Sequence, residues 1–539
     1  MAGMIAAPEP LAAEEGAKVL MAGGNAIDAA VVCAFVQSVV TPQMCGIGGY
    51  ATALLHTAAQ SGPIKSNPVV LDGPGLAGSR CTPTMWQDIV VGMSPTGWGY
   101  VLKGDVNAFG YQAICTPGTV MALGTMLSRW GTISWREAIE PAARIAEAGF
   151  VVSHDLAGDY RIKFLERFTL VDVLRSNPEA SRVFLHEDGS PYDVGQTFRN
   201  PDYARFLRRL AAAGPEDFYR GQIARIISDD FAANGAFVTA EDLANYKIRD
   251  ELPTTTTYRG YRIASSPPPH GGPTLLETLN ILEAYDLPAL GHNSPEYIHL
   301  VSLAMKAAFA DRNQHISDPA FADVPLNWLL SKERAAEWRQ KIDSGIPIED
   351  PRLPPAGHGT TTLTVVDGQG NAVGLTHSLG TSSGAVTPGL GFVYNNSMIN
   401  AHPLPGHPNS IAPGKGRTSG VSPTIVYKDE IPIMVLGAPG GNRIITSVLQ
   451  VILNVLEFGM GMVEAVSEPR FDCQGSTIYC EGRLPGYVCD EVRKRHPIER
   501  LPFNRGGLAL VHAIKIDRPD GRLSGAADTG YGGVALLVP

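Results

Sequence analysis

A glycine followed by a threonine, Gly359-Thr360, stands at the head of a β-branched run two-thirds along the chain. This junction is a candidate site of self-cleavage. If the peptide bond breaks, Thr360 becomes a new N-terminus with a hydroxyl nucleophile and its own α-amino group as general base. With a reference pKa of roughly 7.7 to 8.0, that amine can take up and return a proton near neutral pH. A single residue would then supply two catalytic functions.

A glycine turn downstream is the second candidate for chemistry. A predicted strand at 431–436 runs through Gly440 and Gly441 into an apolar segment at 444–456 with the character of a helix. A strand, a turn and a helix N-terminus in this order expose backbone N–H groups that lack helical partners, as in an oxyanion hole. A Gly-Gly turn alone is more often structural, and a threonine run alone is ordinary strand sequence. Their combination favours catalysis.

The elements that must position these residues follow a mixed pattern, helical in the middle third and strand-rich after Thr360. The Pro/Gly-rich segment 402–416 lies between two candidate site segments, so we expect it to border the pocket. Expected helices are 10–21, 26–40, a helix capped by Thr239 and Asp242, 275–287 and 444–456. Expected strands are 51–55, 69–71, 365–366, 391–394, 424–427 and 431–436.

The composition is that of a large globular protein, with 539 residues of which 44% are hydrophobic. The net charge of -10 is spread without blocks of like charge, so we expect neither nucleic acid nor a membrane as partner. We see no signal peptide, and the longest apolar run, 29–40, is too short to span a bilayer. The seven cysteines show no CxxC or zinc spacing, and their odd number argues against a full disulfide framework. We therefore expect a cytoplasmic protein with free thiols.

Ordered motifs extend along nearly the whole chain. They occupy 23–30, 46–49, 117–120, 141–143, 217–221, 241–246, 258–261 and 267–272, and then 360–367, 370–373, 422–424 and 438–444. With these motifs the chain resembles the gamma-glutamyltranspeptidase family, within the N-terminal nucleophile hydrolases.

The resemblance implies an α+β fold, a four-layer αββα sandwich made as one precursor. The precursor would cut itself into a large subunit, 1–359, and a small subunit, 360–539, which together form one domain. Whether two of these heterodimers form a larger homodimer is left open. By resemblance Thr360 is the nucleophile, Ser378 stands where the family has a threonine that hydrogen-bonds it, and Gly440 and Gly441 are the oxyanion-hole glycines. The resemblance implies no metal and no organic cofactor.

The positions that bind the substrate carboxylate depart from the family pattern. Family members that act on glutathione hold the glutamyl α-carboxylate with an arginine and a pair of serines. Here Pro74 stands at the arginine position, and the serine pair is Ser419 and Gly420. Loss of one half of a charge-assisted pair costs about 2 to 5 kcal/mol. One alternative is that Arg80, six residues after Pro74, restores a carboxylate contact from a shifted position. We interpret it instead as an unaligned surface residue, and we interpret Arg417 and Arg443 in the same way.

The positions that bind the substrate amine depart as well. The family grips the glutamyl α-amino group with an asparagine, a glutamine or glutamate, and an aspartate. The matching positions hold Gly380, Ser397 and Asn400, so no charged partner for an ammonium remains. We therefore expect weak discrimination in favour of glutamyl groups.

The leading hypothesis is a self-processing N-terminal threonine hydrolase that cleaves a small acyl-amide substrate through an acyl-threonine intermediate, with acyl transfer left open beside hydrolysis. One alternative is a gamma-glutamyltransferase or glutathione hydrolase with replacement substrate contacts. Another is an uncleaved, non-catalytic binding relative. Metal-dependent hydrolysis by His270, His358 or His377 is disfavoured, because no histidine pair has helical ligand spacing with a carboxylate.

Overall fold

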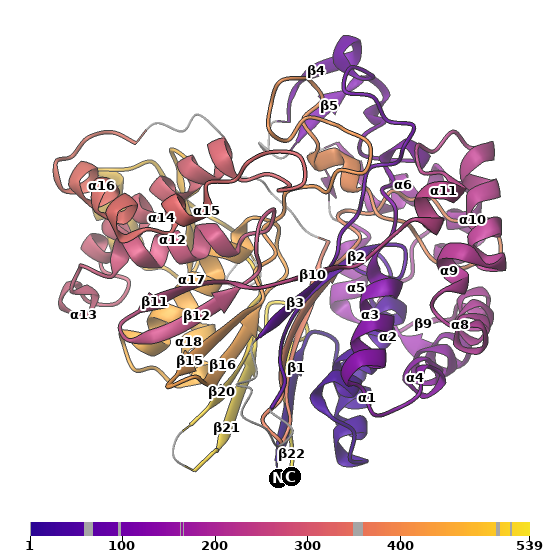
Figure 1. Ribbon diagram of the computed structural model, residues 1–539, viewed down its shortest axis with the longest axis horizontal. Helices are drawn as coiled ribbons and strands as arrows, with labels where there is room; N and C mark the ends of the chain where they lie inside the picture. The colour runs from indigo at the N-terminus through magenta and orange to yellow at the C-terminus, as the bar shows by residue number, and fades with distance from the viewer. Residues whose placement is uncertain are drawn as a thin grey trace.

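The computed structural model describes residues 2–58, 68–94, 99–161, 163–164, 167–348, 359–502, 507–517 and 520–539. Within these residues, two large antiparallel sheets lie face to face at the centre of the molecule, and helices cover the outer face of each (Figure 1). The fold is therefore the four-layer αββα sandwich of the α+β class that the family resemblance implies.

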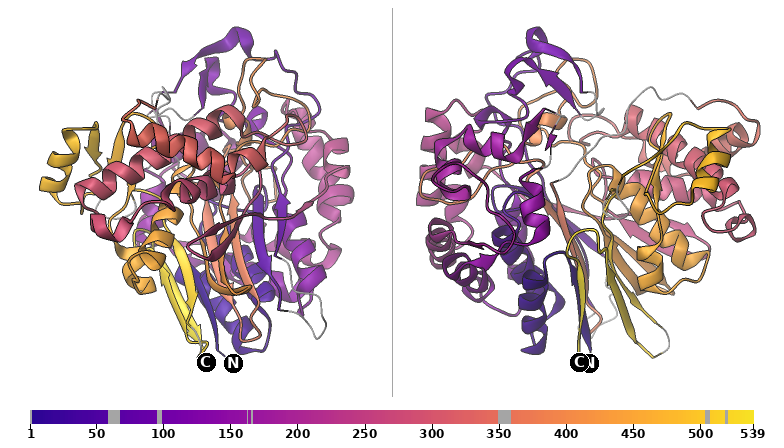
Figure 2. Two further views of the ribbon diagram at one scale, coloured as in Figure 1. Left: turned by 60° about the vertical axis from the view of Figure 1, so that its left-hand side comes forward. Right: turned by 180° about the vertical axis from the view of Figure 1, so that it is seen from behind.

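The first sheet interleaves strands from both ends of the chain. Strands β1 and β22 pair at one edge of this sheet, so the N- and C-termini lie side by side (Figure 2). In spatial order its strands are β10 (Arg249–Glu251), β3 (Val69–Gly73), β2 (Tyr50–His56), β14 (Ala372–Ser378), β13 (Thr361–Val366), β1 (Gly3–Ala7) and β22 (Val534–Val538). The second sheet has the order β11 (Thr254–Tyr258), β12 (Tyr261–Ser265), β15 (Thr424–Lys428), β16 (Ile431–Gly437), β20 (His512–Ile516) and β21 (Leu523–Ala527).

The helices divide between the two outer layers. On the first sheet the longest are α1 (Pro10–Met21), α2 (Ala26–Val40), α3 (Thr119–Trp130), α4 (Trp135–Ala148), α8 (Pro201–Ala213) and α10 (Gln222–Ala233). On the second they are α12 (Gly272–Leu282), α14 (Pro295–His315), α16 (Lys332–Asp343) and α17 (Arg443–Leu456). Shorter helices are α5 (His154–Asp159), α6 (Leu170–Arg175), α7 (Pro178–Phe184), α9 (Asp217–Arg220), α11 (Ala240–Ala244), α13 (Leu287–Leu290), α15 (Leu326–Leu329), α18 (Met462–Ser467) and α19 (Gly486–Arg493). Small strands are β4 (Val90–Met93), β5 (Tyr100–Leu102), β6 (Phe150–Val151), β7 (Lys163–Phe164), β8 (Phe168–Thr169), β9 (Thr197–Phe198), β17 (Phe471–Asp472), β18 (Ile478–Cys480) and β19 (Ile498–Arg500).

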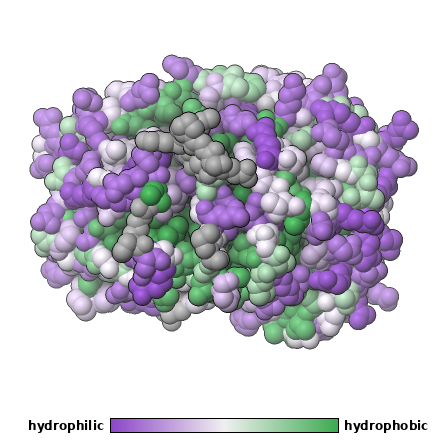
Figure 3. Space-filling view, turned by 60° about the horizontal axis from the view of Figure 1, so that its bottom comes forward, coloured by the Kyte–Doolittle hydropathy of each residue, from purple (hydrophilic) through white to green (hydrophobic). Residues whose placement is uncertain are grey.

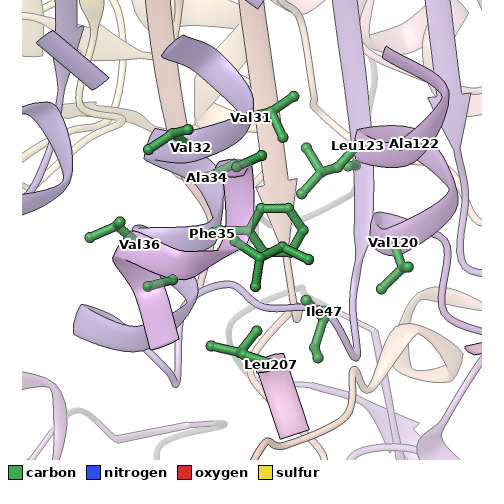
Figure 4. Close-up of a cluster of buried hydrophobic side chains, with 14 of the residues drawn as sticks. Val31, Val32, Ala34, Phe35, Val36, Ile47, Val120, Ala122, Leu123 and Leu207 are labelled. Carbon is green, nitrogen blue, oxygen red and sulfur yellow. The ribbon is translucent and has the colours of Figure 1, made fainter. Parts of the chain in front are cut away.

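Helix α2 is buried along its whole length beneath the first sheet. Its N-terminus is fixed by Asn25, whose side chain accepts from the backbone N–H of Asp28 while the Asp28 carboxylate accepts from the Asn25 N–H. Phe35 lies at the centre of the cluster that α2 forms with α3 and α8 (Figure 4). Between the two sheets, a separate apolar layer joins residues such as Leu54 and Ile425. These layers make the strand ends that carry the site rigid.

Most predicted elements are confirmed, including both N-terminal helices and the Thr239–Asp242 cap of α11. The predicted strand at 391–394 is wrong: only Val393 and Tyr394 make isolated bridges there, and Gly391 has a positive φ that breaks the extended run. The predicted helix at 275–287 ends at 282, because Asp286 caps a separate short helix, α13.

The surface carries no single dominant apolar area on the face seen in Figure 3, where hydrophilic side chains lie around and between smaller hydrophobic areas. All seven cysteines are buried and free. Among the described residues, none of the helices combines the length and apolar character required to cross a membrane.

Candidate active site

Thr360 lies at the entry to β13, and its hydroxyl contacts Ser378 at the end of the neighbouring strand β14. The two hydroxyl oxygens are 2.9 Å apart. Ser378 Oγ donates to the carbonyl of Gly359 at 2.5 Å and accepts from the backbone N–H of Gly380 at 2.9 Å. Because the Ser378 proton is used on Gly359, the Thr360 hydroxyl is the donor in their contact. Ser378 therefore joins the hydroxyl of Thr360 to the carbonyl of the peptide bond that precedes it.

Glycine is required at the position before Thr360. Gly359 has a φ of 120°, and a Cβ there would lie 1.7 Å from the carbonyl oxygen of Gly380. Gly380 itself has a φ of 75°, and its Cβ would lie 2.4 Å from Asn396 Oδ1. Backbone therefore passes backbone at the candidate cleavage site without room for a side chain.

The glycine turn that follows β16 adopts the expected strand, turn and helix arrangement. Gly440 and Gly441 have φ values of 136° and 61°, and α17 begins two residues later at Arg443. Neither glycine N–H donates to another residue in the described part of the chain. Gly441 lines the cavity that contains Thr360, whereas Gly440 is not among its lining residues.

Thr360 opens into a cavity of about 300 Å³. Of the residues proposed from sequence, this cavity is lined by Thr360, Gly380, Asn400, Ser419, Gly420 and Gly441. His402, His407 and Asn409 of the 402–416 loop also line it, so the expectation that this loop borders the pocket is confirmed.

The charged side chains that line the cavity are positive. Its lining includes Arg312 and Arg417, whereas no aspartate or glutamate appears among the described residues that line it. Arg312 donates to the carbonyl oxygens of His270 and Ser419, at 3.1 and 2.7 Å, and so braces the cavity wall. An anionic group is better suited to this cavity than a cationic one.

Two of the sequence-predicted binding residues lie elsewhere. The Pro74 carbonyl accepts from the Tyr246 hydroxyl at 2.7 Å, and Pro74 does not line the cavity that contains Thr360. Ser397 lines a smaller neighbouring cavity, together with Asn400 and Arg417.

His377 is fully buried beside Gln37, and burial lowers its pKa to about 3. His358 lies outside the described residues.

Sequence reasoning missed a buried chain of polar groups behind Ser419. Its hydroxyl lies 2.7 Å from His270 Nδ1, and His270 Nε2 lies 3.0 Å from the carboxylate of Asp72. Asp72 also accepts from the hydroxyl of Thr52 at 2.8 Å. Burial raises the pKa of Asp72, but His270 outweighs it together with the other partners, so the pKa lies below its usual value. The unusual histidine in the Pro-Pro-Pro-His turn was the available signal.

Comparisons with known proteins agree along the full length of the chain. The gamma-glutamyltranspeptidase family model matches residues 12–538. The chain is 36% identical over 535 residues to the acylase ACY 1 proenzyme of Pseudomonas sp. (strain V22), covering 97% of this chain and 91% of that protein. It is 34% identical over 565 residues to the glutathione hydrolase proenzyme of Bacillus subtilis (strain 168), covering 99% and 91%.

A solved structure supports the same grouping. The crystal structure of cephalosporin acylase from Bacillus halodurans has a TM-score of 0.86 to this chain at 29% identity, covering 99% of this chain and 95% of that one. Relatives named as acylases and as glutathione hydrolases thus share sequence with this protein, and a cephalosporin acylase shares its fold. The chain belongs to the gamma-glutamyltranspeptidase family and is an enzyme of the N-terminal nucleophile hydrolase type that acts on amide bonds.

Proposed function

We propose that the chain cuts itself between Gly359 and Thr360 and then hydrolyses a small acyl amide with Thr360 as nucleophile. The observation that carries this proposal is the Ser378 hydroxyl, which binds both the Thr360 hydroxyl and the Gly359 carbonyl. The Ser378 side chain orients Thr360 Oγ1, which is the attacking oxygen, and it polarises the Gly359 carbonyl, which is the group under attack. Relatives named proenzymes lend support.

Self-cleavage requires the Thr360 hydroxyl, the Gly359 carbonyl and one water molecule. Thr360 Oγ1 attacks the Gly359 carbonyl carbon, the bond from that carbon to the Thr360 nitrogen breaks, and the hydroxyl proton moves to the nitrogen. Water then hydrolyses the resulting ester, which leaves a carboxylate on Gly359 and a free amine on Thr360.

The two products, 1–359 and 360–539, are expected to stay together as large and small subunits. In the first sheet, β14 and β13 of the small subunit lie between β2 and β1 of the large one. The strand pairs that join these four strands begin at Thr361, so they do not involve the Gly359–Thr360 peptide bond. Separation would expose the apolar faces on both sides of the sheet.

Turnover then follows from the new N-terminus. The α-amine of Thr360 takes the hydroxyl proton as Oγ1 attacks the amide carbonyl of the substrate, and it passes that proton to the departing amine. The N–H groups of Gly440 and Gly441 bind the oxyanion. Water hydrolyses the acyl-threonine and restores the enzyme. These steps use neither a metal nor an organic cofactor.

The cavity lining argues against a glutamyl preference. Within the described part of the chain, no carboxylate lines the cavity to hold an α-ammonium, and Gly380 and Asn400 supply no charge. A desolvated ammonium without a partner costs several kcal/mol. We therefore assign the enzyme to acyl groups that lack the glutamyl amine, as in acylases, with glutathione hydrolysis as the alternative.

The test compares p-nitroaniline release from simple acyl p-nitroanilides and from gamma-glutamyl-p-nitroanilide, with and without glycylglycine. We expect a higher kcat/KM for an acyl anilide and no large stimulation by glycylglycine. A much higher kcat/KM for the gamma-glutamyl substrate would assign the chain to the alternative. Thr360→Ala is the matched inactive control for both substrates.

A further inference from the structure

A second cavity, of about 430 Å³, lies beside helix α14, which packs against α16, α19 and β17. Four segments far apart in the sequence line it: one face of α14, residues between 342 and 348 at the end of α16, the loop 473–476 between β17 and β18, and residues 495–497 before β19. Its size is that of a small-molecule site. None of its described lining residues lines the cavity that contains Thr360.

The charged side chains that line this second cavity are positive. Lys306 of α14 and Arg495 lie in its wall with the imidazoles of His299 and His496, and no aspartate or glutamate is among the described lining residues. Arg495 has one acidic neighbour, Glu296, at 3.5 Å in an exposed pair. Lys306 makes neither a hydrogen bond nor an ion pair with any residue that the structure describes. A cleft lined by one sign of charge attracts ligands of the opposite sign.

The two histidines of the wall are in direct contact. His299 Nδ1 lies 2.6 Å from His496 Nε2, so one ring donates to the other and the accepting ring is neutral. Burial, the neighbouring ring and the charges of Lys306 and Arg495 together lower the pKa of His496 to about 4. The accepting ring carries its hydrogen on its other nitrogen, so the pair retains an N–H donor. Positive charge is thus concentrated here without a compensating anion.

Ser302 adds a buried hydroxyl without a partner to the same wall. Its side chain lines the cavity, the residue is only 1% exposed, and its Oγ makes no hydrogen bond within the described part of the chain. It lies one helical turn from both His299 and Lys306, on the same face of α14. Because a buried hydroxyl without a partner is unfavourable, a ligand oxygen would supply the contact that this residue lacks.

The remaining lining of the second cavity is largely apolar. One of these side chains, Ile346, is 52% exposed although it is a large hydrophobic residue. The apolar side chains of the lining are Leu303, Ile342, Ile346, Pro347, Ile348 and Pro497. The cavity therefore suits a molecule that combines an anionic group with an apolar group, rather than a small ion alone.

We propose that this cavity is a second ligand site, which binds a small organic phosphate through Lys306, Arg495, Ser302 and the histidine pair. A phosphoryl group carries a charge of about −1.5 to −2 at neutral pH and three acceptor oxygens, which matches two cations and two further donors. A carboxylate has one charge and two oxygens, so it would leave part of this wall without a partner. The site is independent of the proposed hydrolysis, because none of its residues takes part in that reaction.

The test is titration calorimetry of the full-length protein with phenyl phosphate, inorganic phosphate and phenylacetate, in a phosphate-free buffer at constant ionic strength. We expect one phenyl phosphate per chain, bound about tenfold or more tightly than phenylacetate. Equal affinity for inorganic phosphate would identify the free ion as the ligand of the phosphoryl site. Equal or tighter binding of phenylacetate would overturn the phosphoryl assignment, and absence of saturable binding of all three would overturn the site.

Variants of the wall locate the binding energy. Lys306→Gln should weaken phenyl phosphate binding about tenfold or more, and Ser302→Ala about threefold to tenfold. Lys18→Gln is the matched control, because it removes the same charge from the exposed surface of α1 in the other outer layer, and its affinity should equal that of the wild type. Unchanged affinity in both cavity variants, or an equal loss in Lys18→Gln, would overturn the site.

The cavity that contains Thr360 is also positive, so the position of the bound ligand is measured by amide hydrogen exchange. Phenyl phosphate should protect 299–306 and 473–476, whereas protection confined to 417–421 would place it beside Thr360 and overturn the second site. Binding requires neither self-cleavage nor turnover. An uncut chain that binds phenyl phosphate in this way would support the second site and contradict the proposed function, and an active hydrolase that binds none would do the reverse.

Discussion

Replacement of Ser378 with alanine removes a hydroxyl that connects three parts of the site. It breaks the contacts with Thr360 Oγ1 and with the Gly359 carbonyl, and it leaves the Gly380 N–H without its acceptor. The first two contacts belong to the groups that react in self-cleavage, and the third belongs to the fold. The substitution should therefore affect rate and stability separately.

The size of each effect follows from the hydrogen bonds. A hydrogen bond contributes about 0.5–1.5 kcal/mol net, so loss of the two reacting-group contacts should raise the barrier by about 1–3 kcal/mol. Self-cleavage should then slow by about 5- to 150-fold. The unsatisfied, buried Gly380 N–H should lower the free energy of unfolding by about 1–3 kcal/mol.

The assay follows the precursor of residues 1–539 after cell-free synthesis, by denaturing mass spectrometry at timed intervals. Ser378→Thr keeps the hydroxyl and should cleave near the wild-type rate. Thr376→Ala is the control for stability, because its buried hydroxyl contacts Thr362 at 2.6 Å rather than Thr360. If folded Ser378→Ala cleaves as fast as the wild type, the role assigned to this hydroxyl is refuted.

Three further predictions follow from the structure. Gly359→Ala places a Cβ 1.7 Å from the Gly380 carbonyl oxygen and should leave the chain uncut; a normal cleavage rate by mass would contradict the geometry. Gly440→Ala brings a Cβ within 2.6 Å of the Ala509 Cβ and should displace an oxyanion donor, lowering kcat by about 100-fold in the anilide assay, and an unchanged kcat would exclude Gly440 from that role. Burial raises the pKa of the Glu9 carboxyl from about 4.5 to about 8. The folded state therefore holds a proton between these values that the unfolded state releases, and stability should fall with rising pH, by about 1.4 kcal/mol per unit, until pH passes about 8. Glu9→Gln should flatten this part of the profile of thermal midpoints between pH 5 and 9, and an equally steep profile in the variant would assign it to other groups.

Much of the fold was predictable because local signals and the global fold agree. The Asn25 cap and a continuous apolar run define α2, and alternating β-branched residues define the central strands. The strand predicted at 391–394 failed because β-branched and aromatic residues there follow Gly391, whose positive φ turns the chain. Propensity alone does not report that turn.

The candidate site was predictable only in part. Thr360 and the Gly440-Gly441 turn carry short-range signals, and the family resemblance places Ser378 with them. The link from Asp72 through His270 to Ser419 joins segments about 150 to 350 residues apart in sequence and was invisible without the fold. Arg417 was interpreted as an unaligned surface residue, with a shifted carboxylate contact as the alternative, and the structure places it in the lining of the cavity.

The central claim is that Thr360 becomes the N-terminus of a second chain, and intact mass under denaturing conditions tests it most directly. Freshly purified wild type should give two masses, for residues 1–359 and 360–539, and Thr360→Ala should give one mass for residues 1–539. A single uncut mass in the wild type, or two cut chains in Thr360→Ala, would contradict the assignment of Thr360 as the nucleophile of self-cleavage.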